Sequence, residues 1–291
     1  MHSRSRADRV FDLFNYAFLT LLLIVILYPL YFIIIASVSD PISVSGGKVW
    51  LFPVDFTLEG YQRIMENQTI WVGYKNTLVY MTVGTAVNVA ITVTGAYPLS
   101  RKDMYGRNLF MFLITFTMFF SGGLIPTYLL VKSLGLMNSM WALILPGAVS
   151  VWNLIITRTF FQHNIPDELR EAAAMDGCSD FKFFLQVALP LSKSILAVLV
   201  LFYGVSHWNS FFSALIYLRD EAQYPLQLVL RNILIQNEVQ ELMNLDLGAS
   251  NSLSESIKYG VIIVASIPVL ILYPMVQKYF VKGVMIGSLK G

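Results

Sequence analysis

The sequence predicts an all-α integral membrane protein with six transmembrane helices, for three reasons. Of its 291 residues, 56% are hydrophobic and only 13% are charged, about half the charged fraction of an ordinary soluble domain. The missing charge is concentrated in six windows of at least 19 residues without Asp, Glu, Lys or Arg, and about 20 helical residues cross the apolar part of a bilayer. Finally, Lys and Arg gather in alternate connecting segments, as the positive-inside rule requires.

The predicted spans are, in chain order, 13–39, 76–100, 108–131, 133–157, 194–218 and 259–277. The first window follows several Arg residues and could be read as a signal peptide, but its 27 uncharged residues far exceed the roughly 7–15 of a signal-peptide core. Ser121, Gly122, Gly123 and Pro126 interrupt the third window, so its outer end is expected to be broken or kinked. Without an internal repeat or a low-complexity tract, residues 1–291 are expected to form a single transmembrane domain.

The distribution of basic residues predicts the topology. With both termini in the cytoplasm, 13 of the 20 Lys and Arg residues lie on the cytoplasmic side, close to span ends. Loop 158–193 is then cytoplasmic, and loops 40–75 and 219–258 are extracytoplasmic. The net charge of +2 follows from this orientation and indicates no nucleic-acid partner.

The cytoplasmic loop has the pattern of two short helices. Pro166 suits the first helical position, and Gly177 suits the left-handed residue that ends a helix. Ser179 is expected to cap the second helix, and Pro190 to stop or bend it at the membrane surface. In this second helix one apolar stripe is expected; its members are Phe181, Phe184, Leu185 and Ala188.

The first of these helices is expected to present one face formed by Leu169, Ala172, Ala173 and Asp176. Alanine at its centre allows another surface to approach the backbone closely, and Glu171 beside it could meet a cationic partner group. From these residues two interpretations remain open. The loop is either a rigid knob that fits a groove on a soluble protein, or an amphipathic helix pair that packs on the membrane surface.

The same residues resemble a known motif. Glu171-Ala172-Ala173-x-x-Asp176-Gly177, followed by Phe184 and Leu189-Pro190-Leu191, resembles the EAA motif of the permeases of ATP-binding-cassette (ABC) importers. It lies in the cytoplasmic loop before the last two spans, where the family has it. Two positions depart from the usual pattern: Ser194 replaces a common Pro, and Cys178 replaces a small residue.

Further segments extend the resemblance over nearly the whole chain. Residues 208–218 (WNSFFSALIYL) and the tail 277–291 resemble the smaller permease subunit of maltose-type sugar importers. Residues 120–139 and 224–235 are most similar to the branch that imports complex oligosaccharides, often from plant cell walls, including aldouronates.

The resemblance implies the type I ABC importer permease fold in a bacterial cytoplasmic membrane. It also implies four partners: a second homologous permease, two ATPase subunits and an extracytoplasmic solute-binding protein. ATP and Mg would bind to the ATPases, because this chain has no G-x-x-x-x-G-K-[ST] phosphate loop and is expected to bind no cofactor. The implied ATPase-coupling residues are Glu171, Ala172, Ala173, Asp176, Gly177, Phe184, Leu189 and Pro190. The tail 283–291 could reach between the ATPases or be a frayed end.

Polar residues within spans are costly and often line a transport pathway. The candidate substrate-pathway residues are Asn88, Asn153, Tyr203, His207, Trp208 and Asn209, with the two aromatic rings as sugar-stacking surfaces. Ordinary hydrogen bonds between helices would explain the same residues, so both interpretations remain open for each of them.

Other functions fit the sequence less well. Cys178 is the only cysteine, which excludes an intramolecular disulfide, and three scattered His residues predict no metal site. A membrane enzyme would need clustered catalytic groups, and an ion-coupled transporter would need carboxylates within its spans, which hold none. A channel would leave loop 158–193 unexplained. Within the importer class, the remaining alternative is another polar cargo such as a glycerol phosphate.

Overall fold

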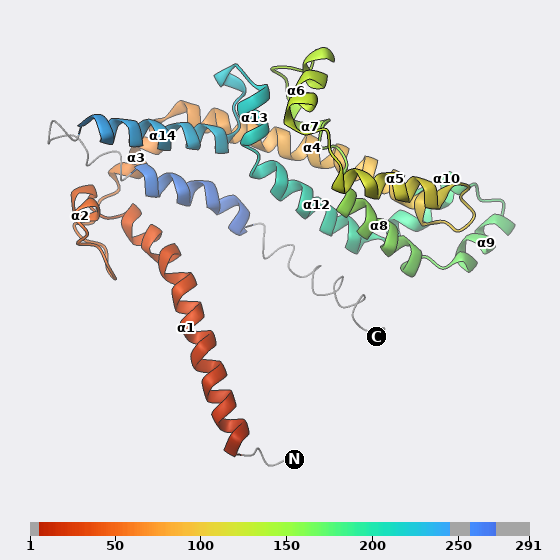
Figure 1. The fold of residues 1–291 in the computed structure, drawn as a ribbon, viewed down its shortest axis with the longest axis horizontal. Helices are drawn as coiled ribbons and strands as arrows, with labels where there is room; N and C mark the ends of the chain where they lie inside the picture. Colours follow the sequence, from red (N-terminus) through yellow and green to blue (C-terminus); the bar gives the residue numbers. More distant parts are fainter. Residues whose placement is uncertain (1–5, 245–256, 272–291) are drawn as a thin grey trace. The chain divides into compact units, whose positions relative to one another are not determined.

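The computed structural model describes residues 6–244 and 257–271 (Figure 1). Within these residues the regular secondary structure is entirely helical. The chain divides into two compact units. One comprises Met1–Gln68 and Leu230–Ile267, and the other comprises Thr69–Val229 and Pro268–Gly291. Helix α14 (Leu226–Asn244) begins in the second unit and continues into the first.

The first unit contains α1, a helix of 32 residues over Arg6–Ser37. Within it, Val10–Ser37 is long and apolar enough to cross a membrane, and nearly all its large apolar side chains are exposed in the isolated chain. Such a surface is suited to lipid or to a neighbouring transmembrane helix. The end of α1 is packed within the unit, where Ile35 and Ala36 meet Val44 and Val49, and the hydroxyl of Tyr28 donates to Trp50 O at 3.3 Å.

Two short helices follow in the same unit. Helix α2 (Pro41–Ser45) is capped by Asp40, whose carboxylate accepts a hydrogen bond from Ser43 N at 3.0 Å. Helix α3 (Glu59–Glu66) is tied to the end of α1, since the hydroxyl of Tyr61 lies 2.8 Å from that of Ser37.

The second unit is organised around three helices that share one apolar core: α4 (Gln68–Ser100), α8 (Val151–Asn164) and α12 (Lys193–Trp208). The buried residues of this core are Val93, Ala96, Tyr97, Leu99, Leu154, Phe161, Phe183, Phe184, Ala188, Leu199 and Tyr203. Phe183, Phe184 and Ala188 come from loop 158–193, so the core fastens that loop to the long helices.

The interruption predicted in the third window is confirmed. Helices α5 (Arg107–Phe119) and α6 (Leu124–Ser133) meet at an angle of 112°. Gly123, which precedes α6, has a φ of +85°, a conformation that is costly for residues with a Cβ atom.

The fourth and fifth windows are also not continuous helices. Residues 133–157 contain the end of α6, the short α7 (Trp141–Ile144), a non-helical segment around Pro146 and Gly147, and the start of α8. Window 194–218 is divided between α12 and α13 (Phe212–Tyr217). Helices α6, α7 and α13 pack together through Val131, Ala142 and Tyr217. The three helices lie in the upper part of Figure 1.

The described residues therefore contain two helices that could cross a membrane alone, Val10–Ser37 and Gln68–Ser100. The number rises to four if each of two bent pairs forms one span. A shorter apolar helix, Ile257–Ile271, covers most of the sixth window, and residues 272–277 of that window lie outside the described part. The six spans remain a prediction.

Candidate functional site

Helix α9 (Asp167–Met175) forms the tip of loop 158–193, at one end of the second unit (Figure 1). It ends in a Schellman motif. Gly177 N donates to Ala174 O at 3.0 Å, Cys178 N donates to Ala173 O at 2.9 Å, and Gly177 has a φ of +77°. These bonds satisfy carbonyls that a helix end leaves free, and they confirm the conformation predicted for Gly177. At the other end, Pro166 is the cap residue rather than the first helical residue.

Nearly all of α9 is exposed, and Ala173 of the predicted face is an exception. Ala173 is partly buried and packs against the apolar core of the unit. Glu171, Ala172 and Asp176 are exposed, and so is the apolar side chain of Leu169. The helix therefore presents apolar, small and acidic side chains outward and is anchored inward through one alanine.

The second helix of the loop differs from its prediction. Ser179 caps α10 (Asp180–Phe183), as expected, by accepting a hydrogen bond from Lys182 N at 3.4 Å. A π-helical turn over Phe184–Ala188 then follows. The buried residues here are Phe183, Phe184 and Ala188, with Val187 partly buried, so the apolar face is offset from the predicted one. The predicted stripe is therefore wrong at Phe181, which is 71% exposed, and at Leu185.

Phe183 is the buried residue that the stripe missed. Beside it, Phe184 packs on Tyr97 of α4 with a ring separation of 4.8 Å, and Tyr97 meets Phe161 of α8 edge-on at 5.6 Å. The chain then bends by 79° from the segment Asp180–Leu191 into α12, two residues after Pro190. Leu189 packs against the core, and Pro190 is exposed. Loop 158–193 is thus held against both α4 and α8.

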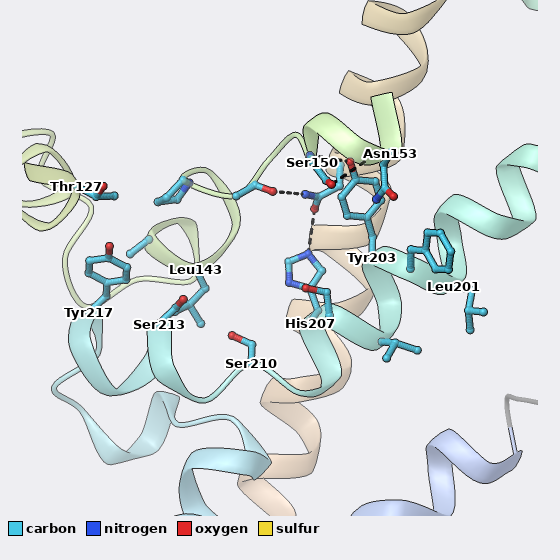
Figure 2. Close-up of a pocket in the computed structure, with 17 residues that line it drawn as sticks. Thr127, Leu143, Ser150, Asn153, Leu201, Tyr203, His207, Ser210, Ser213 and Tyr217 are labelled. Atoms are coloured by element: carbon cyan, nitrogen blue, oxygen red, sulfur yellow. Dashed lines mark hydrogen bonds between the residues drawn. The ribbon is translucent and has the colours of Figure 1, made fainter. Parts of the chain in front are cut away.

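A pocket of about 760 Å³, lined by both polar and apolar residues, lies elsewhere in the same unit, between α4, α6, α7, α8, α12, α13 and the segment after α7. Four of the six predicted pathway residues line it: Asn88, Asn153, Tyr203 and His207. Figure 2 shows His207 and Tyr203 reaching from α12 toward the chain around Ser150. The structure thus brings together residues that are far apart in the sequence.

Hydrogen bonds connect the walls of this pocket. His207 Nε2 lies 2.9 Å from Asn88 Oδ1, while Asn88 Nδ2 donates to Gly147 O and Ala148 O, each at 2.9 Å. Since the amide nitrogen of Asn88 already donates, its oxygen must accept. His207 therefore carries a proton on Nε2, and in the neutral ring Nδ1 is an acceptor.

The Tyr203 hydroxyl makes a second connection. It lies 2.6 Å from Thr92 Oγ1 on α4 and accepts a hydrogen bond from Ser150 N at 3.1 Å. Both networks join α4 and α12 to the segment before α8. Asn88 and Tyr203 therefore also make the hydrogen bonds between helices that were the second interpretation of these residues. These residues build the pocket and also line it.

The remaining two predicted pathway residues do not line the pocket. Trp208 is 2% exposed, with its ring 6.1 Å from that of Tyr74. Asn209 donates to Val205 O of its own helix at 2.9 Å. Sequence reasoning missed several lining hydroxyl residues, namely Thr127, Ser150, Ser206, Ser210, Ser213 and Tyr217. One signal was available, because Tyr203, Ser206 and His207 lie at i, i+3 and i+4 of α12.

The chain is similar to a known protein family and to two curated relatives. The model of the family described as "Binding-protein-dependent transport system inner membrane component" matches residues 1–286. The chain is 43% identical, over 285 residues, to the polygalacturonan/rhamnogalacturonan transport system permease protein YtcP of Bacillus subtilis (strain 168), covering 98% of this chain and 99% of the relative. It is also 43% identical over 291 residues to Protein LplC of the same bacterium, covering 100% and 98%.

A solved structure agrees with these relatives. A chain in the crystal structure of a bacterial ABC transporter involved in the import of the acidic polysaccharide alginate matches 96% of this chain and is itself covered completely, with a TM-score of 0.88 and 35% identity. The family resemblance and the type I ABC permease fold are thereby confirmed. This chain belongs to the family of inner-membrane components of binding-protein-dependent transport systems, and it is a permease subunit of an ABC importer.

Proposed function

We propose that this chain forms one half of the translocation pathway for acidic oligosaccharides, of the kind that contain galacturonate. Two similar proteins are named for transport of acidic polysaccharides: polygalacturonan/rhamnogalacturonan for one and alginate for the other. The 43% identity over nearly the full length of the first relative favours a related cargo here.

The structural observation that supports a sugar as the cargo is the lining of the pocket. The rings of Tyr203 and Tyr217 are buried. The lining offers the hydroxyl groups of Thr127, Ser206, Ser210 and Ser213, the imidazole of His207 and the ring of Phe202, which is 36% exposed. Such a mixture suits a sugar, which presents hydroxyl groups at its edges and an apolar face to an aromatic ring. The preference for an acidic cargo rests on the relatives named above.

Membership of the family implies ATPase and solute-binding partners, and the chain itself is a non-catalytic subunit. We further propose that the second permease is a different, homologous chain and that ATP and Mg bind only to the ATPases. In this scheme α9 fits a groove on an ATPase through Glu171, Ala172, Asp176 and the residues around them. Closure of the ATPases then moves the loop, and the spans alternate between inward-facing and outward-facing states. Six spans with both termini in the cytoplasm complete the arrangement.

The test is transport by the complete importer in proteoliposomes, with both permeases, the ATPases and the binding protein. We expect ATP-dependent uptake of labelled oligogalacturonate, with much weaker uptake of a neutral galactose oligomer of equal length and of glycerol phosphate. Preference for either control solute would refute the proposed cargo. Accumulation by this chain without an ATPase would refute the proposed mechanism.

A matched pair of variants tests the pocket. Ser210→Ala removes a lining hydroxyl, whereas Asn209→Ala changes the adjacent residue outside the lining. We expect the first to raise the sugar concentration needed for half-maximal uptake and the second to leave it unchanged. Equal effects would show that the pocket does not contact the cargo.

A further inference from the structure

A cluster of charged side chains joins the end of α4 to both helices of loop 158–193. Arg101, directly after α4, binds Asp103 through two hydrogen bonds: Nε to Oδ1 at 3.0 Å and Nη2 to Oδ2 at 2.6 Å. Its third nitrogen, Nη1, donates to Asp180 Oδ1 of α10 at 2.6 Å. One guanidinium therefore connects its own loop to α10.

Arg170 of α9 closes this cluster from the other side. Its Nη1 lies 3.2 Å from Asp103 Oδ2 and 3.9 Å from Asp180 Oδ1. Two Arg and two Asp residues thus form a neutral four-membered network that contains one residue each from α9 and α10. Networks with bidentate Arg–carboxylate geometry are more specific than isolated surface pairs.

Partial burial strengthens the cluster. The Arg101 side chain is only 16% exposed. Its hydrogen bonds to Asp103 are the main cause that lowers the pKa of that carboxyl group to about 2. Charges that are partly withdrawn from water interact more strongly than fully solvated ones.

An aromatic contact lies next to the ionic one along α4. Tyr97, four residues before Arg101, packs against Phe184 and Phe161. Residues four apart share one face of a helix. The end of α4 therefore holds loop 158–193 through an apolar contact and, one turn further on, through the charged cluster.

We propose that Arg101 is a positioning residue that fixes α9 and α10 to the end of α4, so that a force on α9 also moves α4. This inference rests on the coupling role proposed above for α9. It adds a mechanical connection that chain continuity does not supply, because loop 158–193 continues directly only into α8 and α12. Helix α4 also carries Asn88, which contacts His207 in the pocket. Thirteen residues separate Asn88 from Arg101, about 20 Å along a helix.

The experiment uses the complete importer and compares Arg101→Gln, Asp180→Asn and the double variant. The readout is the number of sugars imported per ATP hydrolysed, with basal ATP hydrolysis measured separately. We expect each single variant to lower this ratio at least about fivefold, as loss of an allosteric coupling of ordinary size would. The double variant should be little worse than either one, because both remove the same interaction.

Lys102→Gln is the matched control. Lys102 also reaches α9, through Asp167 at 2.9 Å, but its side chain is 82% exposed, and such pairs contribute little. We expect this variant to match the wild type. Equal losses in Lys102→Gln and Arg101→Gln would overturn the inference, since any loop charge would then suffice.

Hydrogen exchange separates this inference from the proposed function. In the assembled complex, Asp180→Asn, whose exposed side chain can change without unfolding the chain, should accelerate exchange of the amides of α9. Unchanged exchange together with an unchanged import ratio would overturn the role of Arg101 while wild-type transport still supports the importer. Failure of the wild type to import any acidic oligosaccharide would instead count against the proposed cargo, and the exchange data would still decide whether Arg101 positions α9.

Discussion

Substitution of Gly84 by alanine tests the packing between α4 and α12. A Cβ atom at Gly84 would lie 2.5 Å from His207 Nε2 and 2.6 Å from Cε1, closer than real contacts allow. The imidazole would have to swing away, and its hydrogen bond to Asn88 Oδ1 at 2.9 Å would be lost.

The size of the effect follows from these contacts. Overpacking costs about 1–3 kcal/mol, and the lost hydrogen bond about 0.5–1.5 kcal/mol. Alanine recovers about 0.5–1 kcal/mol relative to glycine within a helix. We therefore expect Gly84→Ala to lower the free energy of unfolding by about 1–3 kcal/mol, and transport to fall because the pocket wall is displaced.

Gly95 in the same helix provides the control, since a Cβ atom there meets only Leu154 Cδ1 at 3.7 Å. Gly95→Ala should be neutral or slightly stabilising. Unfolding of the purified permease in mixed SDS micelles measures both variants. Adding His207→Ala to Gly84→Ala removes the obstructing ring. The double variant should therefore lose less unfolding free energy than the sum of the losses in the two single variants. Equal stability of Gly84→Ala and Gly95→Ala would refute the reasoning.

Three further predictions follow from individual contacts. Gly177→Val places a β-branched residue at a φ of +77°, which costs about 1–2 kcal/mol; import should fall sharply, and less so for Gly177→Asn, whereas equal import by both would contradict the role of the left-handed turn. Tyr203→Phe removes the acceptor of Ser150 N and the contact to Thr92 Oγ1; it should destabilise the permease by about 1–3 kcal/mol in the same SDS assay, and wild-type stability would contradict this. Asp103 has its pKa lowered from 3.8 to about 2, so its contribution to stability is present above the unfolded pKa and is lost as pH falls from about 4 to about 2; Asp103→Asn should abolish this pH dependence of unfolding, while a difference that appears only above pH 5 would show that another group is responsible.

Local features of loop 158–193 were predictable from its residues. Gly177 ends α9 and Ser179 caps α10, as expected, because caps depend on residues within one turn of the helix end. The prediction of a buried stripe through Phe181 was wrong because helical periodicity alone does not decide which of two overlapping apolar faces is buried. Phe184 packs on Tyr97, and Phe183 is buried in the same core, contacts that are available only once α4 and α8 are in place.

The pocket residues were likewise predictable only in part from the sequence. Charge-free windows identify Asn88, Asn153, Tyr203 and His207 as costly groups within apolar segments, and all four line one cavity. Trp208 and Asn209 have the same composition signal but point elsewhere. A helix turns by about 100° per residue, so neighbours in the sequence face different surroundings.

What the sequence determined by itself is the helical membrane character, the break before Pro126 and the helix end at Gly177. Each is encoded by the residues of a single segment, through apolar length, glycine conformation and helix caps. Only the tertiary structure decided which distant groups meet: Arg101 with Asp180 across 79 positions, and Asn88 with His207 across 119. Such pairs form because three helices share one apolar core, and the packing of that core, rather than any local pattern, sets the distances between their polar side chains.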